Sequence, residues 1–278
     1  MNHRISILKF VFVIVLVLLF PNAHAAGGGW QKLENGLYIG TFDPKKKSKI
    51  YHEKIVVLKI DPKVLSLKLR SASERGRKLR TAKQWCVEFG LLAAINASMY
   101  QSSDFLKSTG HMRNYDHVNN AHIHKDYGAL LLFNPIETSL PEVQMIDQRA
   151  QNDWKSLMLK YHSVVQNYRM ISNGRKADWP KRIVMHRIAA IGMDREDHVL
   201  FILSRALYST HDFINVLLSL QIGIKSTMYV EGGPEATLYL NLNRSRTQSD
   251  EGLGRNLSRH IDESPSSLPN VIGIVRRQ

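Results

Sequence analysis

The chain has 278 residues, of which 44% are hydrophobic and 22% are charged, and Lys and Arg (38) outnumber Asp and Glu (24) for a formal net charge of +14. These values exclude a disordered, collagenous or polytopic membrane protein and predict one domain, because single domains of about 250 residues are common. The single cysteine, Cys86, excludes an intrachain disulfide framework and an all-cysteine zinc site.

The first 25 residues predict a secretory signal peptide. Arg4 and Lys9 form a positive start, residues 10–20 are all apolar, and residues 23–25 read Ala-His-Ala, an A-x-A cleavage signal. The apolar run is too short to span a bilayer comfortably, so we expect cleavage near Ala25 and a periplasmic or secreted chain. Cleavage removes two cations and no acid, which lowers the net charge from +14 to +12.

The basic excess has three candidate explanations, which are a polyanionic wall or polysaccharide partner, an anionic membrane surface, and solubility alone, and charge does not choose among them. The densest basic runs are residues 45–49 and 70–80, and solvated loops are the simpler interpretation of both. Nucleic acid is not expected as a partner, because an exported chain does not meet it and no recognition-helix pattern accompanies the charge.

Residues 55–69 predict a pair of strands. Residues 55–60 and 64–69 are apolar-rich or alternating, and Asp61-Pro62 separates them. Because the connection is a short turn, we expect the two strands to form a hairpin.

A helix and a buried strand are predicted next. Thr81 and Gln84 have the spacing of a capping box, so a helix should begin there and run to residue 89. Gly90 is placed to end this helix, and residues 91–95 predict a buried strand. Cys86 lies inside the helix, where a core role is expected rather than a redox role.

The same order returns later in the chain. Residues 212–221 predict a helix, Gly223 ends it, and residues 226–230 predict a strand. Asn96 follows the first of the two strands and Glu231 follows the second, each before small residues. Ligand sites in sheets with helical connections lie outside the carboxyl ends of strands. We therefore predict Asn96 and Glu231 as site residues, although both could simply cap turns.

Residues 187–194 and 198–205 predict a hairpin between these two units. A symmetric turn would place Arg187 opposite Arg205 at its open end, where like charges are destabilising unless an anion lies between them. The pair therefore predicts a phosphate or carboxylate receptor. Alternatively, one arginine pairs with an acidic residue and the other faces solvent, and a shift of one residue in register would separate them.

Residues 111–127 are rich in histidine, with His111, His117, His122 and His124 near Asp116 and Asp126. The spacing matches no strict zinc motif, and the polar residues indicate an irregular loop. On a strand, His122 and His124 would share one face. A loop that lines the substrate, a metal site and an ordinary surface remain open. No nucleophile or phosphate-loop motif is present, so Glu231 carries the strongest chemical signal.

Four segments form an ordered set of motifs: residues 95–100 read INASMY, residues 163–170 SVVQNYRM, residues 187–192 RIAAIG and residues 228–233 MYVEGG. In this order they resemble the "(I/V)NGGFF" or "INAGMY" strand end and the "QSGPML", "R-x-A-I-G" and "LDGG" strands of the phosphodiester glycosidase family, over roughly residues 55–240. The chain departs from the family pattern at Glu231, which replaces the usual aspartate, and at the positions of several family glycines. The resemblance therefore indicates a divergent member.

The resemblance implies cleavage between an anomeric carbon and a phosphodiester. Arg187, with Arg205, would hold the phosphate. Glu231 would act as a base for water or as the electrostatic partner of the sugar cation, and Asn96 would bind a sugar hydroxyl or a phosphate oxygen. Further substrate-binding residues implied by the motifs and the histidine-rich stretch are Gly232, Gly233, Tyr100, Gln166 and His111.

We predict an α/β or α+β fold, with a mixed sheet and flanking helices in a single domain over residues 26–278. Residues 241–269 are long and polar and predict a mobile flap near the site, before a last strand at 271–275. The predicted function is hydrolysis of a sugar-1-phosphodiester in envelope glycans or exopolysaccharide, without a metal or other cofactor. Alternatives are a non-catalytic glycan-binding or exopolysaccharide-assembly protein on the same fold, and a metal-dependent hydrolase that uses residues 111–126.

Overall fold

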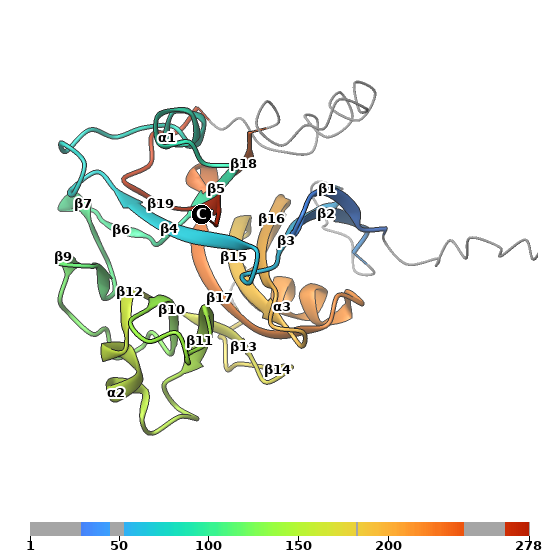
Figure 1. The fold of residues 1–278 in the computed structure, drawn as a ribbon. Helices are drawn as coiled ribbons and strands as arrows, with labels where there is room; N and C mark the ends of the chain where they lie inside the picture. Colours follow the sequence, from blue (N-terminus) through green and yellow to red (C-terminus); the bar gives the residue numbers. More distant parts are fainter. Residues whose placement is uncertain (1–28, 45–52, 182, 242–264, 278) are drawn as a thin grey trace, which may run out of the picture.

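The computed structural model describes residues 29–44, 53–181, 183–241 and 265–277 (Figure 1). The predicted signal peptide and most of the predicted flap lie outside the described residues. Strands make up 49% of the structure and helices 12%. Within the described part of the chain, none of the helices has the length and apolar character needed to cross a membrane.

The largest sheet has eight strands and carries most of the predicted site residues. In spatial order its strands are β1 (Gln31–Glu34), β2 (Leu37–Phe42), β3 (Ile55–Ile60), β16 (Val199–Tyr208), β15 (His186–Asp194), β17 (Ile224–Gly232), β13 (Arg169–Ser172) and β14 (Arg175–Lys176).

Two smaller sheets and a short hairpin complete the β structure. The five-stranded sheet runs β11 (Val143–Asp147), β10 (Ala129–Pro135), β12 (Tyr161–Asn167), β8 (Met112–Asn114) and β9 (His117–Asn120). The four-stranded sheet runs β18 (Leu238–Leu240), β5 (Ala93–Asn96), β19 (Asn270–Arg276) and β4 (Leu65–Ser71). The hairpin pairs β6 (Tyr100–Gln101) with β7 (Asp104–Ser108).

The helices are α1 (Ala82–Phe89), α2 (Trp154–Leu159), α3 (Thr210–Ser219) and the 3-10 turn η1 (Gly233–Glu235). Helix α3 covers one face of the eight-stranded sheet, and the smaller sheets pack against the other face (Figure 1). Alternate residues of β15 therefore enter different layers: Ile188 and Ala190 pack toward α3, whereas Ala189 and Ile191 face the smaller sheets. Burial on both faces explains why this strand is apolar along most of its length.

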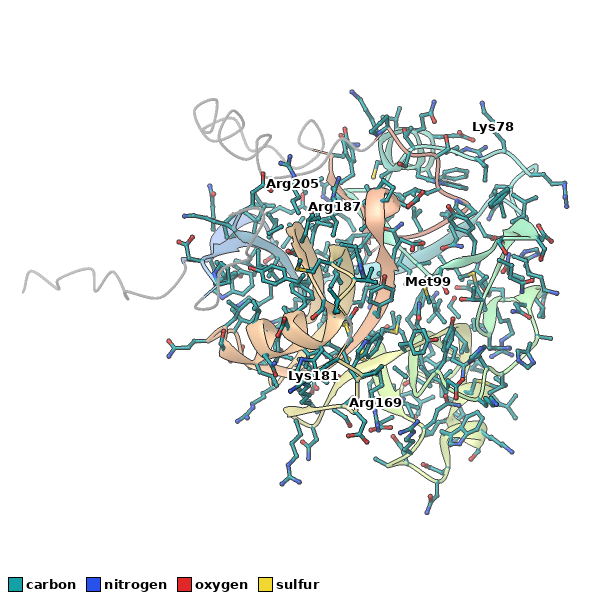
Figure 2. All side chains as sticks on the ribbon, turned by 180° about the vertical axis from the view of Figure 1, so that it is seen from behind. Lys78, Met99, Arg169, Lys181, Arg187 and Arg205 are labelled. Atoms are coloured by element: carbon teal, nitrogen blue, oxygen red, sulfur yellow. The ribbon has the colours of Figure 1, made fainter. Side chains whose placement is uncertain are left out.

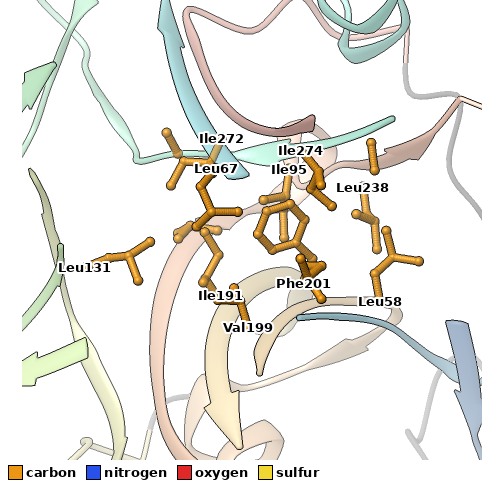
Figure 3. Packing of buried hydrophobic residues seen from close by; sticks show 14 of the residues in the cluster. Leu58, Leu67, Ile95, Leu131, Ile191, Val199, Phe201, Leu238, Ile272 and Ile274 are labelled. Atoms are coloured by element: carbon orange, nitrogen blue, oxygen red, sulfur yellow. The ribbon is translucent and has the colours of Figure 1, made fainter. Parts of the chain in front are cut away.

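The main core lies where the three sheets meet (Figure 3). Ile191 and Phe201 from the eight-stranded sheet pack with Ile95 and Ile272 from the four-stranded sheet and with Leu131 from the five-stranded sheet. All five side chains are fully buried. This shared core holds the ends of β5 and β17 in fixed positions relative to each other.

The predicted fold class is confirmed only in part. A β-rich structure with a few helices is present, but every strand pairing in the described residues is antiparallel, so the mixed sheet is wrong, and of the two predicted classes α/β does not fit, whereas α+β does. The error has a physical reason: β5 and β17 are apolar because other layers cover both of their faces, a pattern that is typical of parallel strands.

The predicted early hairpin is also wrong. Strand β3 pairs with β2 and β16, whereas β4 pairs with β19 in another sheet. Strand β3 is apolar on both faces and occupies an interior place in its sheet. In β4 buried residues alternate with half-exposed Ser66, Lys68 and Arg70, and this pattern suits its place at a sheet edge.

Other local predictions are confirmed. Helix α1 has the Thr81 capping box, and Gly90 ends it in the left-handed conformation with φ 67°. Strands β15 and β16 form the predicted hairpin, with Met193 opposite Val199 next to the turn. Helix α3 begins two residues earlier than predicted, because the Ser209 hydroxyl accepts a hydrogen bond from the Asp212 backbone and caps it.

Candidate active site

Glu231 lies at the end of β17, where a β-bulge interrupts the pairing with β15. Ala189 is opposite Glu231 and Ala190 is opposite Tyr229, so Val230 is the extra residue. The Glu231 side chain is only 9% exposed, and its Oε1 accepts a hydrogen bond from the Gly232 backbone at 2.9 Å. Burial, against the lowering effect of that hydrogen bond and with a smaller contribution from the charge of Glu235, raises the pKa of the Glu231 carboxyl to about 7.

Asn96 and Thr237 hold the turn that carries Glu235, a second carboxylate close to Glu231. The Asn96 amide donates to the Glu235 carbonyl oxygen at 3.0 Å, and Asn96 Oδ1 accepts from the Thr237 backbone at 2.7 Å. The Thr237 hydroxyl donates to the same carbonyl at 2.9 Å. The predicted site residue Asn96 thus joins the end of β5 to η1, directly beyond Glu231. Its amide positions Glu235, which the sequence analysis did not select.

Three tyrosines lie near enough to Glu231 for its charge to affect the pKa of their phenols. Burial and the charges of Glu235 and Glu231 raise the pKa of Tyr100. Burial raises the pKa of Tyr127 to about 12, and the Glu231 charge contributes to that rise. The same two causes raise the pKa of the Tyr229 phenol. All three phenols therefore remain neutral hydrogen-bonding groups beside Glu231 at physiological pH.

The tyrosines belong to a continuous row of aromatic rings. Ring centroids are 4.3 Å apart for Tyr127 and Tyr168, 5.2 Å for Tyr168 and Trp179, and 6.1 Å for Trp179 and Tyr229. The row ends at His186, 6.2 Å from the Tyr229 ring, with 3.3 Å between the phenol oxygen and His186 Nε2. Such a row can pack against the flat face of a sugar ring.

Gly232 makes room for the Tyr229–His186 contact. A Cβ atom at this position would overlap the Tyr229 hydroxyl and would lie 2.6 Å from His186 Cδ2. The space beside Gly232 is therefore filled by side chains of the protein itself. Gly233 differs, because its φ of 75° lies in the left-handed region that glycine favours, and it turns the chain from β17 into η1.

Arg187 and Arg205 lie close together at the open end of the β15–β16 hairpin (Figure 2). The Arg187 guanidinium donates to the Ala236 carbonyl oxygen at 3.3 Å and so reaches the turn after Glu231. Arg205 forms an ion pair with Glu53 at 3.2 Å. Burial lowers the pKa of Arg187, and the charge of Arg205 lowers it further. The structure thus combines the two interpretations: the arginines are neighbours, and one of them pairs with an acid.

Gln166 does not have the placement expected of a substrate contact. It is fully buried, and its Oε1 accepts from the backbones of His111 and His124 at 3.2 and 2.9 Å. Its amide donates to the carbonyl oxygens of His124 and Tyr127 at 3.0 and 2.9 Å. Because protein groups occupy both ends of the amide, the geometry gives Gln166 a positioning role. It fixes the stretch that presents Tyr127 to the site.

The histidine-rich stretch is only partly irregular, because β8 and β9 occupy much of it. Residues 121–128 have no strand, so His122 and His124 do not share a strand face, and their ring centroids are 6.1 Å apart. His111 is 8% exposed, and its Nδ1 donates to the Ala121 carbonyl oxygen at 3.3 Å. It therefore faces the interior of the loop rather than an open surface.

In the described ranges, no three potential metal ligands of residues 111–126 converge. A convergent group does occur at Asp194, Glu196 and His198 in the β15–β16 turn, with ligand atoms within 4.8 Å of one another. Asp194 already accepts hydrogen bonds there from the backbones of Glu196 and His198 and from the His198 ring, which explains the turn without an ion. Two cavities of about 280 and 650 Å³ also lie near this turn and β11, away from Glu231.

Comparisons with known proteins agree with this architecture. The sequence model of the phosphodiester glycosidase family matches residues 89–275. A search of curated proteins finds no match. A hypothetical protein from Synechocystis has a similar structure with a TM-score of 0.60 at 11% identity, over 92% of this chain and 65% of its own, so this chain spans less than two thirds of its length.

Two further solved structures are similar. The catalytic domain of zebrafish N-acetylglucosamine-1-phosphodiester alpha-N-acetylglucosaminidase, auto-inhibited by its pro-peptide, has a TM-score of 0.57 at 11% identity, over 90% of this chain and 87% of that one. A protein from Burkholderia pseudomallei whose name describes it as exported has a TM-score of 0.51 at 10% identity, over 80% and 74%. At these identities the similarity concerns the fold.

Glu235 and the aromatic row were not predicted from the sequence, whereas Tyr100, which lies near both carboxylates but outside the row, was. Glu235 could have been noticed, because a second acid four residues after a strand-end acid lies within reach of the same site. The aromatic residues Tyr127, Tyr168 and Trp179 had no comparable signal, since they come from separate segments that only the tertiary fold brings together.

Proposed function

The chain belongs to the phosphodiester glycosidase family, and we propose that it hydrolyses the bond between the anomeric carbon of a sugar and a phosphodiester. The observation that carries this proposal is the buried Glu231 carboxyl, whose pKa is raised to about 7 beside Glu235 and the tyrosine rings. A pKa near the working pH suits a group that transfers a proton. We further propose that the enzyme acts on anionic glycans of the cell envelope after export, which suits a mature chain of charge +12.

In the proposed reaction the bond between the anomeric carbon and the phosphate oxygen breaks, and its electron pair stays on that oxygen. Protonated Glu231 donates a proton to the departing oxygen. The Glu235 carboxylate stabilises the developing sugar cation and accepts a proton as water attacks the anomeric carbon. The products are a free sugar and a phosphomonoester, and solvent restores the two carboxyl groups.

Arg187 and Arg205 are the proposed phosphate receptor. Both guanidinium groups lie at the hairpin end, and Arg187 points toward the Ala236 carbonyl beyond η1. An anion between them would offset the mutual repulsion that lowers the pKa of Arg187. Charge that develops on the leaving phosphate would be stabilised in the same way. Glu53 pairs with Arg205 and keeps that side chain in place before substrate binds.

Release of free sugar from soluble sugar-1-phosphodiesters tests the proposal. Glu231→Gln should lower kcat by at least a hundredfold, because the amide cannot donate a proton to the leaving oxygen at neutral pH. Glu235→Gln and Arg187→Ala should each lower kcat/KM. The matched control is Glu137→Gln, which removes an exposed carboxylate from the β10–β11 connection and should retain wild-type turnover. Wild-type rates in both Glu231→Gln and Arg187→Ala would refute the assignment.

A non-catalytic glycan-binding protein on the same fold is the second candidate, and one observation favours it. The Tyr229–His186 pair fills the space beside Gly232, and the buried Ala97 and Ser98 replace the glycines that follow the family's strand-end asparagine. A ligand therefore has less access to the backbone here than the family motif provides. Binding of glycan by a preparation that turns over none of the phosphodiesters would support this candidate.

A further inference from the structure

A dense cationic surface surrounds the loop between β4 and α1, apart from the two carboxylates. We call it the arginine patch, and its members are Lys68, Arg70, Arg75, Arg77, Lys78 and Arg80, of which only Arg80 is buried. Residues 75–79 are all exposed, and Lys78 lies at the edge of the molecule (Figure 2).

Three arginines of the patch gather around one aromatic ring. The guanidinium carbons of Arg70, Arg75 and Arg80 lie 5.5, 6.0 and 5.4 Å from the centroid of the Phe89 ring. Glu88 holds Arg80 with two hydrogen bonds of 2.7 Å, so the charge of Arg80 is balanced within the protein. The aromatic platform orders side chains that would otherwise spread apart in solvent.

The rest of the patch has little acid to balance it. Glu74 pairs with Arg75 at 3.3 Å, but its carboxylate also accepts from the Asn114 amide. After desolvation, the charge of Arg75 is the next largest cause that lowers the pKa of Arg70, and the charge of Arg70 likewise lowers the pKa of Lys68. Like charges held this close are relieved when an anion binds between them.

The fold presents the exposed charges in a fixed turn. The Arg77 backbone donates to the Ala72 carbonyl oxygen at 2.7 Å, and Arg77 itself adopts the left-handed conformation with φ 57°. This conformation costs free energy for a residue other than glycine. The turn thus places Arg75, Arg77 and Lys78 on one exposed bend beside Arg70.

The β6–β7 hairpin connects the patch with the candidate active site. Tyr100 on β6 lies near both carboxylates, because their charges, after burial, raise the pKa of its phenol. Its ring centroid is 5.5 Å from that of Phe105 on β7. Leu106, the residue after Phe105, packs against the same hydrophobic cluster as Phe89. The Asn119 amide also donates to the Leu106 carbonyl oxygen at 2.7 Å and to the hydroxyl of Ser73, in the turn of the patch, at 2.8 Å. A polymer bound on the patch could therefore continue across this hairpin to Glu231.

We propose that the arginine patch binds an anionic glycan chain and holds it while one of its linkages occupies the site at Glu231. Binding by the patch stands on its own charges, and only the delivery to Glu231 rests on the proposed function. The ligand chemistry is a flexible polymer with repeated phosphate, sulfate or carboxylate groups, because several separated guanidinium and ammonium groups match repeated anions better than a single ion.

The test compares two triple variants of the full-length mature protein that lose equal charge. One carries Arg75→Ala, Arg77→Ala and Lys78→Ala in the patch. The matched control carries Arg149→Ala, Lys155→Ala and Lys160→Ala, three exposed cations at and near α2. Dextran sulfate is the probe, neutral dextran is the blank, and titration calorimetry gives the affinity at several salt concentrations.

The patch variant is expected to lose about ten- to a hundredfold in affinity. The slope of log K against log salt should be smaller in magnitude by about two, because the variant makes fewer ionic contacts and so releases fewer counterions from the polymer on binding. The control variant should retain wild-type values. Equal loss in both triples would show that net charge alone acts, and no loss in either would also overturn the proposal. So would binding to vesicles with anionic lipid in the absence of binding to dextran sulfate.

Turnover separates this inference from the proposed function. If both hold, the patch variant should show a lower ratio of turnover on a polymeric phosphodiester to turnover on a small soluble one. If the wild type turns over neither substrate but the patch variant still binds dextran sulfate more weakly than the control variant, the proposed function fails, whereas binding of an anionic polymer by the patch is supported. An unchanged ratio would overturn delivery to Glu231.

Discussion

Glu231→Gln is expected to make the folded protein more stable above neutral pH while it removes activity. The carboxyl is buried at the end of β17, and its pKa rises from 4.5 to about 7 on folding. Each unit of pKa shift corresponds to about 1.4 kcal/mol, so the ionised carboxylate costs the folded state about 3 kcal/mol. A neutral amide avoids this cost and can still accept the hydrogen bond from Gly232.

The sign of the pH dependence follows from proton linkage. Between the unfolded pKa of 4.5 and the folded pKa of about 7, the folded protein holds the Glu231 proton that the unfolded chain has lost. Wild-type stability therefore falls relative to the variant as pH rises through this window, and the difference is complete above it. At pH 4 the two proteins should be nearly equal, and at pH 8 the variant should be more stable by about 3 kcal/mol.

Urea unfolding of both proteins at pH 4 and pH 8 measures this difference, and thermal unfolding should show a melting temperature higher by about 6–12 °C at pH 8. Glu137→Gln is the control, since it removes an exposed carboxylate and should show no comparable change between the two pH values. The reasoning is refuted if Glu231→Gln is less stable than the wild type at pH 8, or if the difference between the proteins does not depend on pH.

Gly232→Ala should lower the free energy of unfolding by about 1–3 kcal/mol, because the added methyl group would overlap Tyr229 and His186; an unchanged melting temperature would contradict this. Trp179→Ala should raise KM for a sugar phosphodiester more than it lowers kcat, because it removes one ring of the aromatic row; a fall in kcat at constant KM in steady-state assays would contradict a binding role. Asn96→Ala should cost about 1–3 kcal/mol in urea unfolding, because it leaves the buried Thr237 backbone N–H without a partner and removes one of the two donors to the Glu235 carbonyl oxygen; a loss below about 1 kcal/mol would show that water replaces the amide.

Local sequence patterns predicted the elements that depend on neighbouring residues. The Thr81 capping box, the left-handed Gly90 and the β15–β16 hairpin all follow from chemistry within a few positions along the chain. The strand ends at Asn96 and Glu231 were found in the same way. Antiparallel pairing was not, because an apolar strand buried on both faces has the same composition in either kind of sheet.

The candidate site was only partly predictable, because its walls come from distant segments. Gln166 was selected as a substrate contact from its place in a motif, whereas its burial and five hydrogen bonds show that it holds the loop carrying Tyr127. Asn96 was selected correctly as a strand-end residue, but its amide is used to position Glu235. Sequence spacing gives the place of a polar side chain, and only the packed structure gives the direction in which its donors and acceptors point.

Hydrolysis of a sugar-1-phosphodiester in 18O-labelled water tests the central claim most directly. Attack of water at the anomeric carbon, assisted by Glu231 and Glu235, leaves the original oxygen on phosphorus. The account therefore predicts that mass spectrometry of the released phosphomonoester finds no label, and that Glu231→Gln releases neither product at a comparable rate. Label in the phosphomonoester would show that water attacks phosphorus, which would contradict glycosidic cleavage at this site.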